Sequence, residues 1–260
     1  MSGLSLPSVV RSEWIKFRSV RSTLTGLLVT VGLTIGLGAL IATAIRGHWD
    51  QMDPIAKLTF DPVSTSLGGT LFAQFATGVI GTQFITSEYS SGSIRTTLAA
   101  VPRRGLLVAA KLVVLVLTLL VVAELVCVGA FLLGQSIFAG VVPTASLATG
   151  GVLRAVLLGG LYLTLLGVWG FALGLILRHS AAAISTFTSL LMVLPIVMLL
   201  LPASWQSAAS KYLPSELGRA MMSSAPRLDL FSPGVAVTLL VVYVALTTAI
   251  GTTLLVRRDA

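Results

Sequence analysis

The sequence predicts an all-α protein that crosses a membrane with six helices. Hydrophobic residues make up 55% of the 260 residues and charged residues only 10%, whereas a soluble domain carries roughly 25% charged residues. The mean hydropathy is +0.99. A soluble protein needs polar groups to cover its surface, so this composition excludes an ordinary soluble enzyme. Long apolar runs instead indicate helices, which satisfy their own backbone hydrogen bonds in lipid.

Six apolar runs are each long enough to cross a bilayer, which takes about 20 helical residues. They cover residues 24–45, 63–86, 112–138, 153–177, 181–201 and 235–256. The second run is the most polar and contains Gln74, and the fifth contains Pro195, which predicts a kink. The first run is longer than the apolar core of a secretory signal peptide, so we expect it to be retained as a span.

The distribution of basic residues predicts that both termini lie in the cytoplasm. The segments before the first span, after the second, after the fourth and after the sixth carry 11 Lys and Arg, and the remaining connections carry six. An excess of Lys and Arg marks the cytoplasmic side. Topology therefore accounts for the net charge of +8, and nothing indicates nucleic-acid binding, because no basic groove with interleaved aromatic residues is present.

Residues 6–21 predict a helix that lies in the membrane interface. Apolar residues recur along one helical face and basic residues lie off it: Leu6, Val10, Trp14 and Phe17 on the face, and Arg11, Lys16 and Arg18 off it. A helix with Trp and basic residues lies in the headgroup plane, where anionic lipid attracts it. The alternative is a basic flank that happens to be helical.

The connection over residues 87–111 is longer than a turn between two spans requires. Ile94, Leu98 and Val101 share one face of a short helix, which a preceding serine is expected to cap and Pro102 to end. We expect an amphipathic helix of about two turns at the cytoplasmic surface, with one face on the membrane domain and the other available to a partner.

The connection over residues 202–233 predicts a re-entrant or cap-like element on the outer side. Prolines interrupt it too often for a span, and Trp205 and Tyr212 are candidate interface anchors. A short helix is expected over 215–222, after Pro214. Residues 1–260 thus form one transmembrane domain.

Motifs for catalysis and metal binding are absent from the sequence. No lysine follows a glycine, so there is no phosphate-binding loop for ATP. There is one cysteine, and neither His48 nor His179 has carboxylates at metal-ligand spacing. We therefore predict no enzyme activity, no metal and no cofactor in this chain itself.

Of the 26 charged residues, only Glu124 is expected deep in the membrane, near the middle of the third span. A charge there costs several kcal/mol unless it is neutralised, paired or hydrated. Glu124 therefore indicates either a function, such as substrate contact or proton handling, or a hydrogen bond between helices. With Gln74 and Pro195 it is a candidate for the pathway or for helix packing. Two glycine pairs, Gly32/Gly36 and Gly170/Gly174, are expected to allow close helix approach.

Three segments together resemble the permease subunits of ABC transporters of the exporter-type, type-2 family. They are Ser12-Glu13-Trp14-Ile15-Lys16-Phe17-Arg18-Ser19 before the first span, Glu88-Tyr89-Ser90-Ser91-Gly92-Ser93-Ile94-Arg95 with Leu98, Pro102 and Arg103 after the second, and Tyr212-Leu213-Pro214 in the outer loop. The resemblance covers the whole six-span layout. Where the family often has Glu-x-Glu-x-Gly-Thr, this chain has Glu-Tyr-Ser-Ser-Gly-Ser, with a single Glu.

The resemblance implies a subunit of a multi-pass exporter in the cell inner membrane, paired as a dimer of identical or related permeases. Two copies of a separate ATPase would carry ATP and Mg. The helix after the second span would be the coupling helix that docks on the ATPase, with the contact residues Glu88, Tyr89, Ser91, Gly92, Ser93, Ile94, Arg95 and Leu98. Trp14, Lys16, Phe17 and Arg18 would belong to the family's connecting helix. The alternatives are an ion- or proton-coupled carrier that uses Glu124, a membrane scaffold and an intramembrane enzyme.

Overall fold

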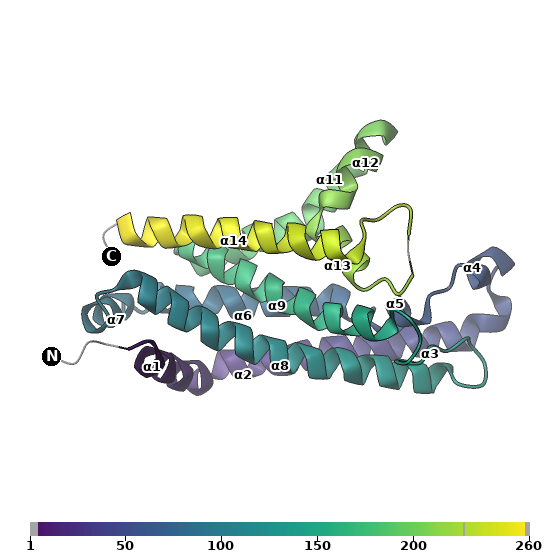
Figure 1. Cartoon of the computed structure of the whole chain (residues 1–260), viewed down its shortest axis with the longest axis horizontal. Coiled ribbons are helices and arrows are strands. Elements are labelled where there is room, and N and C mark those ends of the chain that lie inside the picture. The colour runs from purple at the N-terminus through teal and green to yellow at the C-terminus, as the bar shows by residue number, and fades with distance from the viewer. Residues whose placement is uncertain (1–4, 226, 258–260) are drawn as a thin grey trace.

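A computed structural model describes residues 5–225 and 227–257, and these form helices and connections without a strand (Figure 1). Within these described ranges, five helical stretches are long and apolar enough to cross a membrane. They are Arg21–Gln51, α8 (Arg104–Phe138), α9 (Val152–Leu177), Ser180–Met198 and α14 (Pro233–Arg257). The expected multi-pass helical architecture is therefore confirmed, with five such helices in place of the six expected.

Two of these stretches contain a π-helical segment. The first consists of α2 (Arg21–Val31), the π-helical η1 (Gly32–Leu37), α3 (Gly38–His48) and a short 3₁₀ turn, η2 (Trp49–Gln51). The fourth consists of α10 (Ser180–Thr188), the π-helical η3 (Ser189–Val193) and α11 (Leu194–Met198). Pro195 is the second residue of α11, two residues after the end of η3. Because proline lacks an N–H and clashes with the carbonyl four residues earlier, the wider π turn accommodates it.

The expected second span differs most from the prediction. A short helix, α5 (Pro62–Ser66), precedes a turn, and the long helix α6 (Thr70–Ser90) follows it. The 21 residues of α6 extend about 31 Å, which matches the bilayer core. It is not among the five apolar helices, because glutamine, threonine and glycine recur along it and several of them are buried against neighbouring helices.

The helix α9 lies at the centre of the bundle, where α6, α8 and α14 pack against it. The crossing of α6 and α9 is close because glycines meet there. A Cβ atom at Gly81 would overlap the Gly167 carbonyl oxygen, and one at Gly170 would overlap the Gly78 carbonyl oxygen. Thr82 also donates a hydrogen bond to the Gly170 carbonyl, at 3.0 Å.

The two predicted surface helices lie at one end of the bundle, beside the end of α14 (Figure 1). They are α1 (Leu6–Ser19) and α7 (Ile94–Ala100). The buried face of α1 consists of Val9, Glu13 and Phe17, whereas Trp14 is 44% exposed. The helix is confirmed, and its position in a membrane interface stays a prediction. The sequence did not predict that Glu13 lies on the buried side of this helix.

The remaining short helices lie toward the other end of the bundle. There α4 (Pro54–Leu58) precedes α5, and α13 (Pro214–Met221) packs against α14. Figure 1 shows α11 and α12 (Ala203–Ala209) projecting away from the bundle; a short turn, η4 (Ser210–Tyr212), joins α12 to α13. The helix expected after Pro214 is thus present, shifted by one residue.

Candidate functional site

Four charged side chains meet where α1, α6 and α8 converge. The Nζ of Lys111 lies 2.6 Å from Oε2 of Glu13 and 2.8 Å from Oε1 of Glu88. The Nζ of Lys16 lies 2.8 Å from Oε1 of Glu13 and 3.2 Å from Oε1 of Glu88. We call these four residues the charge cluster. Its two ammonium groups balance its two carboxylates, and it joins three helices that are far apart in the sequence.

Most of the charge cluster is buried. Lys111 and Glu13 are each 1% exposed and Glu88 is 8% exposed. A buried charge is unfavourable unless it is paired and hydrogen-bonded, so each member depends on the others. Lys111 also lies over the ring of Phe84, with Nζ 4.5 Å from the centroid, a favourable cation–π distance. One oxygen of Glu88, Oε2, is buried and has no hydrogen-bond partner in the part of the chain that the structure describes.

Lys16 is the member of the charge cluster that is most exposed to solvent. Burial opposes its charged form, but its hydrogen bond to Glu13 and the charges of Glu88 and Glu13 outweigh that effect, so the pKa of Lys16 lies above its ordinary value of 10.5. The Nζ of Lys16 also donates a hydrogen bond to Oγ1 of Thr97, at 3.2 Å. The short helix α7 is thereby attached to the cluster.

The helix α7 has one face on the protein and one face exposed. Ile94 and Thr97 are buried, whereas Arg95, Thr96 and Ala99 are exposed. Gly92, in the turn before it, has a φ of +72°, a conformation that glycine adopts without strain. Ser93 is the N-cap residue of α7, but its side chain makes no capping hydrogen bond. Its hydroxyl instead lies 2.9 Å from the hydroxyl of Ser91.

The predicted contact residues therefore divide by exposure. Glu88 and Ile94 are buried within the chain, so their side chains are not available to a partner in this conformation. Tyr89, Ser93 and Leu98 are half-buried, and Ser91, Gly92 and Arg95 are exposed. A direct contact with a partner stays a prediction for the exposed members.

The depth of Glu124 in the membrane stays a prediction, but the sequence did not predict that Glu13 and Lys111 are buried within the chain. Lys111 lies inside α8, which begins at Arg104, and not at a helix end. The available sequence signal was the position of Glu13, four residues after Val9 and four before Phe17, which places all three on one helical face. The pairing partner could not be read from that pattern, since it comes from a different helix.

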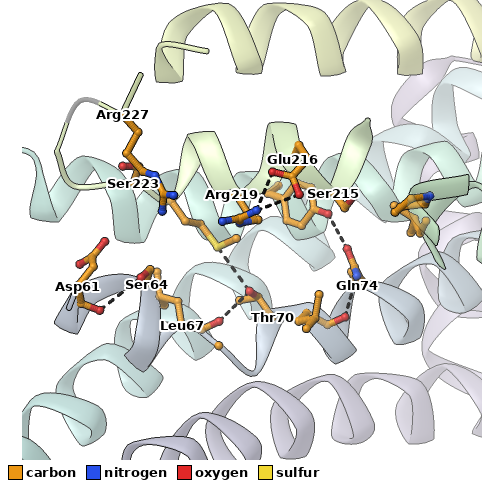
Figure 2. Close-up of a pocket in the computed structure, with 16 residues that line it drawn as sticks. Asp61, Ser64, Leu67, Thr70, Gln74, Ser215, Glu216, Arg219, Ser223 and Arg227 are labelled. Atoms are coloured by element: carbon orange, nitrogen blue, oxygen red, sulfur yellow. Dashed lines mark hydrogen bonds and ion pairs between the residues drawn. The ribbon is translucent and has the colours of Figure 1, made fainter. Parts of the chain in front are cut away.

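A cavity of about 450 Å³ lies at the other end of the bundle, between α5, α6, α9 and α13 (Figure 2). Gln74 and Pro195 both line it. The Tyr162 hydroxyl donates a hydrogen bond to Oε1 of Gln74 at 2.5 Å, and Gln74 in turn donates to the Leu71 carbonyl at 2.7 Å. The lining is mixed in charge, because it also holds the Glu216–Arg219 ion pair, at 2.8 Å.

Glu124 does not line this cavity. Its carboxylate packs against Gly160 of α9, where an added Cβ would lie 2.6 Å from its Cδ, and one of its oxygens is buried without a partner. Within the described residues, no group of three or more His, Cys, Asp or Glu side chains is arranged to hold a metal ion. The structure brings Gln74 and Pro195 together and leaves Glu124 apart.

The hydrogen bond between Tyr162 and Gln74 leads to a testable expectation. We expect Tyr162→Phe to lower the free energy of unfolding by about 1–3 kcal/mol, because it leaves a buried amide oxygen without a partner. Unfolding in detergent measures the change. The matched variant Tyr243→Phe loses only a 3.3 Å hydrogen bond at an exposed position, so an equal effect of both variants would contradict this account.

Comparison with known proteins identifies the family. A family model described as an ABC-2 family transporter protein matches residues 9–195, which begin in α1, end in α11 and include the whole charge cluster. We found no match among curated proteins. Members of this family are membrane subunits that are not themselves catalytic and that associate with an ABC ATPase subunit. The chain belongs to the ABC-2 family of transporter permeases.

Proposed function

We propose that the chain is the membrane-spanning subunit of an ABC exporter and that a separate ATPase supplies the energy for transport. The observation that supports this most is the attachment of α7 to the charge cluster. The helix α7 has an exposed outer face and is joined through Lys16 to the cluster that connects α1, α6 and α8. A movement of α7 would therefore be transmitted to these three helices. The chain itself has no phosphate-binding loop, which agrees with an external source of energy.

In this proposal the chain crosses the membrane six times, with α6 as the second span. Its length of 21 residues supports this assignment, and its polar residues are sheltered because they pack against α9 and α2. The subunit lies in the inner membrane of the cell. Both of its termini and α7 lie on the cytoplasmic side. The segment 202–233 lies on the outer side as a cap. Two permeases and two ATPase copies, which bind ATP and Mg, form the transporter.

ATP binding would close the ATPase pair and move α7. Thr97 and Lys16 would pass that movement to the charge cluster, and so to α1, α6 and α8. Because α6 also lines the outer cavity through Gln74, its displacement would change access to that cavity. ATP thereby shifts the population between inward-facing and outward-facing states.

The exposed face of α7 provides the test. We expect Ala99→Asp to reduce ATPase co-purification about tenfold, because a new charge in the centre of an interface must lose its water. Transport should fall with it, while the thermal unfolding midpoint of the permease stays unchanged because Ala99 is exposed. The measurement is affinity purification from cells that express both subunits, followed by an ATPase assay.

Ala148→Asp is the matched control, since Ala148 is exposed in the connection before α9, on the proposed outer side. It should leave the complex and its activity intact. Unchanged co-purification and transport in Ala99→Asp would overturn the docking assignment.

A further inference from the structure

We propose that α1 and α8 together form a binding site for one anionic phospholipid of the inner leaflet. This inference rests on the proposed cytoplasmic position of α1 and not on the ATPase partner. The site combines an apolar groove along α8 with two unpaired arginines of α1.

The groove has a volume of about 480 Å³ and is bounded by Val10 and Trp14 of α1 on one side. On the other side it follows α8, where Val113, Leu117 and Val121 are 36%, 59% and 58% exposed. These three residues are spaced four apart, so they form a stripe about 12 Å long on one helical face. A stripe of that length accommodates much of an acyl chain.

Among its described lining residues, the groove offers a polar ligand little beyond the indole N–H of Trp14. The hydroxyl of Thr118 already donates a hydrogen bond to the Val114 carbonyl, at 2.8 Å. The groove also runs along α8, which is expected to face lipid. Its chemistry therefore selects hydrocarbon and excludes a polar peptide or a free metabolite.

Two arginines flank Trp14, which bounds the groove. Arg11 precedes Trp14 by three residues and Arg18 follows it by four, so helical periodicity places both next to Trp14 on the surface of α1. Both arginines are exposed, and within the described residues neither forms a hydrogen bond or an ion pair. Lys16, by contrast, is engaged in the charge cluster. Arg11 and Arg18 are therefore the charges of α1 that remain free for a ligand.

An anionic phospholipid matches both parts of this site. Guanidinium groups bind phosphate through paired hydrogen bonds, and Trp14 is a residue type that favours the level of the headgroups. The acyl chain would lie along α8 while the phosphate contacts Arg11 and Arg18. Because two cations face one headgroup, a lipid with net negative charge is preferred over a zwitterionic lipid.

The test uses the full chain in nanodiscs of equal parts palmitoyl-oleoyl phosphatidylglycerol and phosphatidylcholine, with retained lipid counted by native mass spectrometry after release into detergent. We expect phosphatidylglycerol to be retained preferentially. The double variant Arg11→Gln/Arg18→Gln should reduce that preference about thirtyfold, since two basic residues near an anionic surface together contribute on the order of 2 kcal/mol. Arg11→Lys/Arg18→Lys should keep most of the preference, which separates loss of charge from damage to the helix.

Two controls make the outcome decisive. Arg95→Gln/Arg103→Gln removes the same number of exposed cations from the same end of the bundle without altering the groove, and it should leave retention unchanged. Leu117→Trp should fill the groove and reduce retention of both lipids. Inorganic phosphate should not displace the lipid, whereas displacement would indicate an anion site without a lipid chain. Equal retention by wild type and the Arg11/Arg18 glutamine variant, or an equal loss in the Arg95/Arg103 control, would overturn the proposal.

Discussion

Lys111→Met is expected to lower the free energy of unfolding by about 3–5 kcal/mol, the usual effect of removing one partner from a buried ion pair. Lys111 is 1% exposed and bonds both Glu13 and Glu88 at 2.6 and 2.8 Å. Methionine retains the volume but leaves two buried carboxylates with only Lys16 to balance them. Denaturant titration of the purified permease in detergent measures the loss.

Two further variants isolate the charge from the packing. Replacing all three buried charges, in Glu13→Gln/Glu88→Gln/Lys111→Met, leaves only the partly exposed charge of Lys16 in the cluster and should recover most of the stability. Lys16→Met should have a smaller effect than Lys111→Met, because the Lys16 side chain is 42% exposed. A loss below about 1 kcal/mol for Lys111→Met, or a triple variant as unstable as the single one, would contradict the role given to the charge cluster.

The second large effect is expected at the crossing of α6 and α9. Gly81→Ala should destabilise the protein by about 3 kcal/mol, at the upper end of the range for overpacking, because the new methyl group would overlap the backbone of Gly167. Neither helix has a flexible side chain at this point that could move aside, so the helices must separate. The yield of monodisperse protein and its thermal unfolding midpoint report the effect.

Gly36→Ala is the matched control, since a Cβ there would meet nothing within 4 Å. The same substitution at Gly36 should therefore be close to neutral. Equal thermal midpoints for Gly81→Ala and the wild type would show that the two helices are not held at this separation.

These glycines also show how far the sequence could predict the packing. Gly170 and Gly174 do approach α6, where added Cβ atoms would collide with Gly78 and Ile85. Gly32 and Gly36 have the same spacing but face open space within this chain. A spacing of four residues places two glycines on one helical face, but it does not determine whether another helix lies there.

The surface helices and the polar second span show a related limit. Helical periodicity predicted α1 and α7, and Pro214 predicted the start of α13, because these are local signals. The burial of Glu13 on α1 follows from its ion pair with Lys111, which lies on a different helix. The break before α6 has a similar origin: a side chain at Gly69 would collide with the Thr34 carbonyl. Such contacts between distant segments are not encoded in any local pattern.

Cross-linking from α7 tests most directly the central claim, that this permease is driven through α7 by a separate ATPase. The chain suits the experiment because its single cysteine, Cys127, is buried, so an introduced surface cysteine is the accessible thiol. Thr96→Cys lies on the exposed face of α7, and Ala148→Cys is an exposed control in the connection before α9. We predict that a short bifunctional reagent joins Thr96→Cys, and not Ala148→Cys, to a protein that mass spectrometry identifies as an ABC ATPase. No ATPase adduct at Thr96→Cys, or equal adducts at both positions, would contradict the account.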